Sequence, residues 1–308
     1  MSMGLQIQLL ALLISVACAI PGTFLVIQKK SMVSDCITHT ILLGIVIVFL
    51  LVQDLNSPFL LVGASGMGVV TLWLTETLIL SKLMSEDSAI GVIFPFLFSI
   101  ALILISKYAG NTHLDVDMVL LGEIALAPFD PLYLFGRNLG AKGIYIAFAL
   151  MISNLLYISL FLKEIKLVIF DPVLASIMGI SPVLFQYSLV TMVSFTAVGA
   201  FSSVGAILVV AFMIVPATTA YLLTNDLKLM LCYSCIIGGI SGFLGASLAI
   251  YLGNVSFSGC IAMVLGFFFC LAFLFSPKGG LVYLKKQKSE QKKEFLSLLE
   301  ETENTLPK

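Results

Sequence analysis

The sequence predicts an all-α protein, a polytopic bundle of eight to nine transmembrane helices, and three observations support that prediction. Of 308 residues, 60% are hydrophobic and only 11% are charged, and the mean hydropathy is +1.12. A soluble domain carries about a quarter charged residues, so this much apolar surface requires lipid around it. Apolar runs of about 20 residues, long enough to cross a bilayer, recur from end to end.

Nine apolar segments are the candidate spans, and they cover residues 5–27, 36–52, 59–80, 88–106, 141–162, 183–200, 203–223, 229–251 and 257–275. Only FSS separates the sixth from the seventh, so one span followed by a short re-entrant helix is the eight-span alternative. We expect residues 1–284 to form the transmembrane domain. The polar residues 285–308 form a cytoplasmic tail, in which EFLSLLEE has the spacing of a short amphipathic helix.

Lysine and arginine set the expected orientation, because they are enriched in cytoplasmic loops. The tail KKQKSEQKKE is basic, so the carboxyl end is expected inside, and counting back through nine spans places residue 1 outside. The first segment resembles a signal peptide, but no positive charge precedes it and Lys29 and Lys30 follow it, which favours a retained span. The connections expected inside are 28–30, 81–87, 163–166 and 224–228. Lys107, Arg137 and Lys142 fall outside as a modest exception.

Small residues cluster in GASGMG (63–68) and GGISGFLGAS (238–247), where they recur three and four positions apart. In lipid this spacing lets helix backbones approach closely. Packing inside a single bundle is sufficient to explain it, and a dimer face is the alternative.

Several function classes are disfavoured. No G-x-x-x-x-G-K-[ST] run is present to hold nucleotide phosphates, and no H-E-x-x-H or aspartate-rich repeat occurs, so no catalytic set is found. The net charge of −1 provides no basic surface for nucleic acid. Cys232 and Cys235 form one C-x-x-C without a second pair or a nearby histidine, so all six cysteines are interpreted as small hydrophobes rather than redox or metal groups.

Ionisable residues in or beside apolar spans are costly, and they are therefore functional candidates. Glu76 lies near the predicted inner end of the third span, six residues before Lys82, where it either reaches the interface or takes part in transport. In the outer loop, Asp115, Asp117 and Glu123 accompany His113; they are either solvated loop charges or an acidic funnel that concentrates cations.

The strongest candidates are Asp35 and His39 in SDCITHT (34–40), where one apolar segment has just ended and the next begins. Residues four apart share one face of a helix, so an oxygen and a nitrogen ligand would point the same way. Carboxylate and imidazole suit divalent manganese, iron or zinc. The alternative is structural: Asp35 caps the second helix and His39 is a satisfied interface residue.

The run VIQKKSMVSDCITHTILLGI resembles the start of the membrane permease subunits of ATP-binding-cassette importers for zinc, manganese and iron. That family has two basic residues, then Gly-Asp-Ala-x-Ser-His; here Ser34 stands for the Gly and Thr38 for the Ser. The runs EDSAIGVIF, HLDVDMVLLGEI, FDPVLASIMGIS, VGAILVVAFMIVPATTA and FLFSPKGGL are similar to later family motifs in the same order, over residues 5–281. Glu123 stands where Asn or Ser is more usual.

The resemblance implies a permease subunit of the bacterial cytoplasmic (inner) membrane, with no permanently bound cofactor. Its cargo is a divalent ion, and Asp35 and His39 line the path. The implied partners are a cytoplasmic ATPase, a periplasmic or outer-surface metal-binding lipoprotein, and a second permease that is a copy or a paralogue. The missing phosphate-binding loop fits, because ATP hydrolysis then belongs to another chain and this chain is a transport subunit rather than an enzyme. Which of the three metals is carried stays open.

The resemblance also directs attention to the predicted inner surface, where an ATPase must act. In related importers a short cytoplasmic helix after a Val-Pro-containing span docks on the ATPase, so residues 217–231 are the expected coupling segment. Its named residues are Pro216, Ala217, Asn225, Asp226 and Lys228. Pro216 is expected to break or kink the helix where it leaves the membrane. A second expected inner loop is marked by Asp171, Ala175 and Gly179.

Two rival functions are kept. An importer permease for a chelated metal, of siderophore or cobalamin type, would need no ligating side chains and is usually longer, with ten spans. A secondary transporter driven by an ion gradient would need no ATPase.

Overall fold

The computed structural model of the chain describes residues 2–53, 59–108, 124–134 and 137–276. Within these residues, nine helices are long and apolar enough to cross a membrane, as predicted. They are α1 (Met3–Ile27), α2 (Ser31–Val52), α3 (Phe59–Leu80), α4 (Glu86–Tyr108), α6 (Lys142–Phe170), α8 (Pro182–Val204), α9 (Ala206–Leu223), α10 (Leu227–Leu252) and α11 (Phe257–Phe275).

Four shorter elements complete the described chain: the 3₁₀ helix η1 (Ile124–Phe129), the strands β1 (Pro131–Leu134) and β2 (Arg137–Ala141), and the short helix α7 (Pro172–Ile177). The strands form an antiparallel hairpin in which Leu134 pairs with Arg137. The all-α expectation missed this hairpin, since its two strands are too short to show a period of two in the sequence.

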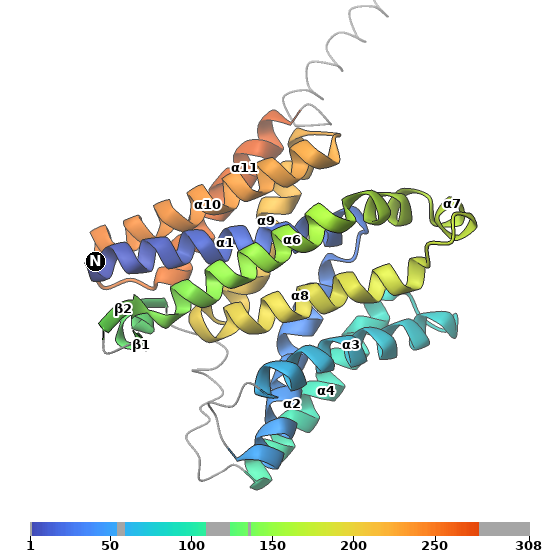
Figure 1. Ribbon diagram of the computed structural model, residues 1–308, viewed down its shortest axis with the longest axis horizontal. Coiled ribbons are helices and arrows are strands. Elements are labelled where there is room, and N and C mark those ends of the chain that lie inside the picture. Colours follow the sequence, from blue (N-terminus) through green and yellow to red (C-terminus); the bar gives the residue numbers. More distant parts are fainter. Residues whose placement is uncertain (1, 54–58, 109–123, 135–136, 277–308) are drawn as a thin grey trace, which may run out of the picture.

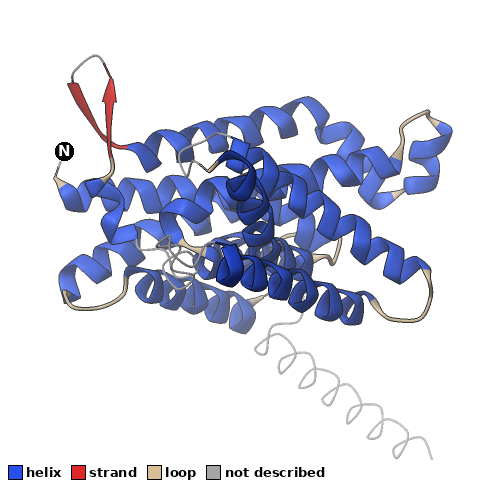
Figure 2. Cartoon of the chain, turned by 90° about the horizontal axis from the view of Figure 1, so that it is seen from below, coloured by secondary structure: helices blue, strands red, loops and turns tan. Residues whose placement is uncertain are grey.

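The long helices form two groups (Figure 1). In that view α1, α6, α8 and α10 run across the molecule, and α2, α3 and α4 form a separate group below them. The hairpin and the amino terminus lie at one end, and α7 lies at the opposite end between α6 and α8, which Figure 2 also shows. The hairpin and the amino terminus are thus at the end expected outside, and α7 is at the end expected inside.

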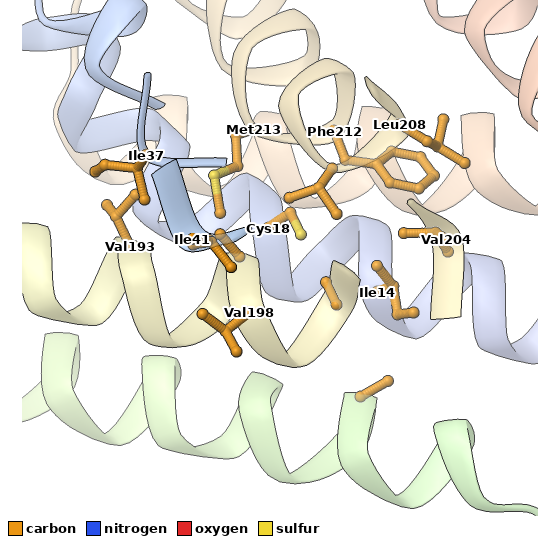
Figure 3. Close-up of a cluster of buried hydrophobic side chains, with 14 of the residues drawn as sticks. Ile14, Cys18, Ile37, Ile41, Val193, Val198, Val204, Leu208, Phe212 and Met213 are labelled. Atoms are coloured by element: carbon orange, nitrogen blue, oxygen red, sulfur yellow. The ribbon is translucent and has the colours of Figure 1, made fainter. Parts of the chain in front are cut away.

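Helix α2 joins the two groups because it contributes to the apolar core of both. Its first half adds Ile37 and Ile41 to the largest core cluster, where they lie among side chains of α1, α8 and α9 (Figure 3). Its second half adds Val46 and Phe49 to a second cluster shared with α3 and α4. Asp35 and His39 therefore lie on the half of α2 that packs against the larger group.

Helices α8 and α9 meet at Gly205, whose φ of 79° lies in a region that side-chain-bearing residues rarely adopt. A single residue therefore separates a helix of 23 residues from one of 18. Both are long and apolar enough to span the membrane, so the structure favours nine spans over the eight-span alternative.

Two predicted boundaries were wrong. Residues 163–166 were expected as a loop, but α6 continues through them to Phe170 after non-helical backbone angles at Phe161. The second apolar segment was expected to begin at 36, but α2 begins at Ser31. In both cases polar residues extend a helix beyond the apolar stretch, which hydropathy alone does not detect.

The small-residue runs bring helices into contact, as their spacing predicted. A Cβ on Gly63 would overlap Val48 of α2, and a Cβ on Gly242 would lie 2.7 Å from the Ala11 carbonyl oxygen of α1. Gly22 is equally tight, since a Cβ there would overlap the Met213 carbonyl of α9. These glycines pack within one bundle.

Candidate functional site

Asp35 and His39 lie on the second and third turns of α2, at the end of the bundle expected to face the cytoplasm. The N-cap of α2 is Lys30, and no side chain caps this terminus. The alternative in which Asp35 caps the helix is therefore wrong. The chain reaches α2 through a tight turn in which the Lys30 amide donates to the Leu25 carbonyl and Lys29 adopts a φ of 60°.

The two side chains face each other. The Nε2 atom of His39 lies 3.6 Å from Oδ1 of Asp35, and the side chains are 23% and 42% exposed. This separation is longer than a normal hydrogen bond. Two ligand atoms that each bind one ion at about 2.0–2.2 Å lie about 2.8–3.6 Å apart when the angle at the ion is between a right angle and the tetrahedral angle. The observed spacing is therefore at the upper edge of what one transition ion accepts.

Aromatic rings of α4 hold the imidazole in place. The ring centroid of His39 lies 4.8 Å from that of Phe94 and 6.1 Å from that of Phe98, and the two phenyl rings are themselves 6.0 Å apart. Packing of this kind restricts rotation of the ring and keeps Nε2 on the Asp35 side.

The second ring nitrogen of His39 lacks a hydrogen-bond partner in the residues that the structure describes. The Nδ1 atom of His39 is buried and has no hydrogen-bond partner within the described part of the chain. Histidines that bind metal through one nitrogen nearly always donate a hydrogen bond from the other. Among the described residues, no third His, Cys, Asp or Glu joins this pair to make a metal-binding group. One chain thus offers two candidate ligands, and the second nitrogen of the candidate histidine has no hydrogen-bond partner among the described residues.

Glu76 is engaged with other residues. One carboxylate oxygen lies 3.8 Å from the Lys30 ammonium and accepts a hydrogen bond from Gln186. The other accepts a hydrogen bond of 2.8 Å from the Tyr187 hydroxyl. Its side chain is only 25% exposed, so Glu76 is not simply a solvated interface charge. The other acidic candidates, Asp115, Asp117 and Glu123 with His113, lie outside the described residues.

Asp171, Ala175 and Gly179 are the residues that shape α7. The Asp171 carboxylate accepts the Leu174 amide at 2.9 Å and caps the helix. Ala175 is its buried contact, and the Ile180 amide donates back to the Ala175 carbonyl across Gly179, whose φ is 80°. This is a Schellman ending, which glycine favours.

The outward face of α7 is apolar and exposed. Val173, Leu174, Ile177 and Met178 have 67%, 43%, 76% and 65% of their surface accessible. Helix α7 itself lies at the far end of the molecule from the hairpin, between α6 and α8 (Figure 1). A short helix that exposes this much apolar surface beyond the span has a shape suited to a protein partner.

The expected short helix within residues 217–231 does not form. Helix α9 continues through Pro216 to Leu223, and Pro216 and Ala217 are buried in it. Three residues, 224–226, then lead into α10, where Asp226 caps the helix by accepting the Lys228 amide at 3.0 Å. Pro216 does not end α9 because tight packing against α1 and α10 supports the helix on both sides of it. Of the named residues, only Asn225, Asp226 and Lys228 lie on the surface.

Sequence reasoning missed the neighbours of the candidate ligands. Phe94 and Phe98 are separated by four positions in an apolar helix, which is the ordinary spacing of core residues. The grouping of Lys30, Glu76, Gln186 and Tyr187 joins three segments distant in sequence, and only tertiary packing brings them together.

Comparison with known proteins identifies the family. The ABC 3 transport family matches residues 3–276. The chain is 42% identical over 282 residues to the manganese transport system membrane protein MntD of Bacillus subtilis (strain 168), covering 92% of this chain and 95% of that one. It is also 42% identical over 280 residues to the zinc transport system membrane protein TroD of Treponema pallidum (strain Nichols), covering 91% and 76%. The solved structure of PsaBC from Streptococcus pneumoniae in complex with a Fab superposes with a TM-score of 0.76 at 26% identity, covering 92% and 96%. The chain belongs to the ABC 3 transport family.

Proposed function

We propose that this chain is the permease subunit of an importer for a divalent transition-metal ion, manganese, zinc or iron. An outer binding protein delivers the ion, and a separate cytoplasmic ATPase drives the cycle. The observation that carries the proposal is the facing pair of Asp35 and His39, a carboxylate and an imidazole 3.6 Å apart on a membrane helix. The chain has the same sequence identity, 42%, to a manganese and to a zinc transport protein, which supports a divalent transition metal as cargo without favouring either metal.

Asp35 and His39 act as ligands that replace part of the hydration shell of the passing ion. The carboxylate supplies negative charge, and the imidazole supplies a borderline-soft nitrogen, a combination that suits manganese, iron and zinc. The Phe94 and Phe98 rings keep the imidazole oriented, so the ion meets a prepared site.

A second permease copy or a paralogue completes the site. Two ligands are few for a transition ion, and two such pairs across a dimer axis would supply four. Asp35 is 42% exposed in the single chain, which leaves it accessible to a facing subunit.

The ATPase contacts α7 and the connection at residues 224–228. Support for α7 comes from its exposed apolar face and its rigid ends, with the Asp171 cap at one end and the Gly179 turn at the other. Short rigid elements transmit force between subunits better than flexible loops. The inner-membrane location of the complex follows from the same assignment.

The test is metal uptake by the complete complex reconstituted in vesicles, with manganese(II), zinc(II) and iron(II) in competition. His39→Ala is expected to abolish uptake while insertion and assembly stay normal. The matched control is Phe96→Ala, which removes a ring from the exposed face of α4, where Phe96 is 61% accessible. Normal uptake by the His39 variant would refute the ligand assignment.

The same assay separates the rival functions. Uptake of a chelate in preference to the free ion would support a permease for chelated metal. Uptake that continues without the ATPase subunit, driven by an ion gradient, would support a secondary transporter. Metal-dependent ATP hydrolysis in the complex supports the proposal.

A further inference from the structure

Glu76 holds a network that connects the candidate ATPase-contact region to the helix that carries the candidate metal ligands. Its carboxylate accepts hydrogen bonds from Gln186 and Tyr187, which lie on the second turn of α8. It also forms an ion pair with Lys30, the N-cap of α2, whose ammonium lies 3.8 Å away. Helix α8 follows α7 after a tight turn that contains Gly179. The path from α7 to Glu76 is therefore short and helical.

Helix α3 contacts α2 on both sides of the ligand pair. Below the pair, Glu76 contacts Lys30. Above it, the Thr71 hydroxyl donates a hydrogen bond of 2.8 Å to the Thr40 hydroxyl, one residue beyond His39. Both threonines are buried. Asp35 and His39 thus lie between two polar contacts made by the same neighbouring helix.

The surroundings of Glu76 favour a positioning role over a ligand role. Both of its oxygens already accept hydrogen bonds, and one of them also lies 3.8 Å from the Lys30 ammonium. A divalent ion at this carboxylate would have to displace the Lys30 ammonium and the Tyr187 hydroxyl. Charge-assisted hydrogen bonds of this kind are stronger than neutral ones, and removing one partner leaves the others unpaired in a largely apolar bundle.

We propose that Glu76 is a positioning residue that couples α7 to α2. When the ATPase displaces α7, the start of α8 moves, Gln186 and Tyr187 carry Glu76 with them, and α3 shifts α2 through Lys30 and Thr40. The geometry of Asp35 and His39 then changes, and the ion is released or received. This inference rests on the proposed function, since it assigns a means of coupling to the same transport path.

The first test is a comparison of Glu76→Gln with Asp87→Asn in the reconstituted complex, with manganese(II) and zinc(II) as the ions. Asp87 is an exposed carboxylate in the first turn of α4, at the same end of the bundle. In Glu76→Gln the ion pair is lost while size is kept. We expect the maximal rate of uptake per ATP hydrolysed to fall about tenfold, because the ion pair with Lys30 is lost and the hydrogen bonds from Gln186 and Tyr187 are no longer charge-assisted. The KM for metal and the rate of ATP hydrolysis stay near wild type, and Asp87→Asn behaves as wild type.

Tyr187→Phe provides an internal check, because Tyr187 acts through Glu76. It is expected to lower uptake less than Glu76→Gln does, and the double variant is expected to be no worse than Glu76→Gln alone. A raised KM or an altered preference between the two metals in Glu76→Gln would make Glu76 a ligand and overturn the proposal. Unchanged uptake per ATP would overturn it too.

A second measurement needs no transported ion. The exposed native cysteines are first removed by Cys232→Ser and Cys270→Ser. A single reporter cysteine is then introduced at an exposed position, either Met32→Cys on α2 or Val183→Cys on α8. Reaction with a water-soluble maleimide is timed with and without a trapped ATP state of the complex. With Glu76 present, we expect the labelling rate at both sites to differ between the free and the ATP-trapped complex. In Glu76→Gln, we expect only the labelling rate of the α8 site to differ.

If the α2 site still responds in Glu76→Gln, coupling does not pass through Glu76. This readout is separate from the proposed function: uptake that survives His39→Ala would refute the ligand assignment, yet the labelling rates would still show whether α2 follows α8.

Discussion

The imidazole of His39 packs against the ring of Phe94 with 4.8 Å between their centroids, so a residue of α4 orients a candidate ligand of α2. Phe94→Ala removes that support. Aromatic pairs contribute about 0.5–1.5 kcal/mol beyond area burial, and a freely rotating imidazole binds an ion less well. We expect the KM for metal to rise several-fold in uptake assays, with a small loss of thermal stability. Phe96→Ala, on the exposed face of the same helix, should leave the KM unchanged; an equal rise there would indicate a general effect on α4.

Asp35→Asn tests the charge of the carboxylate separately from its size. The amide keeps the shape of the side chain and one acceptor oxygen, but it removes the negative charge that compensates the desolvated ion. Mutating a residue that only hydrogen-bonds to a metal ligand typically lowers metal affinity about 10–100-fold. For a direct ligand we therefore expect metal affinity to fall by at least about tenfold. Equilibrium binding of manganese(II) or zinc(II) to the purified complex measures this. An affinity within twofold of wild type would remove Asp35 from the path.

Gly22→Ala tests the crossing of α1 and α9. A Cβ at Gly22 would overlap the Met213 carbonyl. The nearest atoms are all backbone atoms of Met213, so no flexible side chain can move aside to make room. Overpacking of this kind costs about 1–3 kcal/mol, so we expect poor yield and a lowered melting temperature in detergent. Gly66→Ala is the matched control, because a Cβ there meets nothing within 4 Å. Alanine in that helix position is expected to be neutral or to stabilise by roughly 0.5–1 kcal/mol.

Ile177→Asp tests the outward face of α7. Ile177 is 76% exposed, so the isolated permease should keep its stability to within about 0.5 kcal/mol. A charge in an apolar docking surface should nevertheless release the ATPase, which co-purification measures directly. Phe129→Asp is the control at the opposite end of the molecule, where Phe129 is 69% exposed and η1 ends. Retention of the ATPase by Ile177→Asp would exclude this face as its contact.

The sequence alone determined the class of the protein and the identity of its candidate ligands. Apolar runs of span length can be seen in the sequence itself, so the nine long helices were predictable, although the end of α6 and the start of α2 were not. Asp35 and His39 were predictable as a pair because a spacing of four residues fixes a shared helix face. The family resemblance marked Asp171, Ala175 and Gly179 as part of an inner loop, and in the structure they are the cap, the buried contact and the terminal turn of α7.

Only the tertiary structure decided what surrounds those residues. That α9 continues through Pro216 depends on its packing against α1 and α10, which local propensity does not contain. The contacts of His39 with Phe94 and of Glu76 with Lys30 and Tyr187 join helices distant in sequence. Periodicity reports which face of a helix is apolar, but it does not report which helix covers that face, because this choice depends on how all the helices fit together.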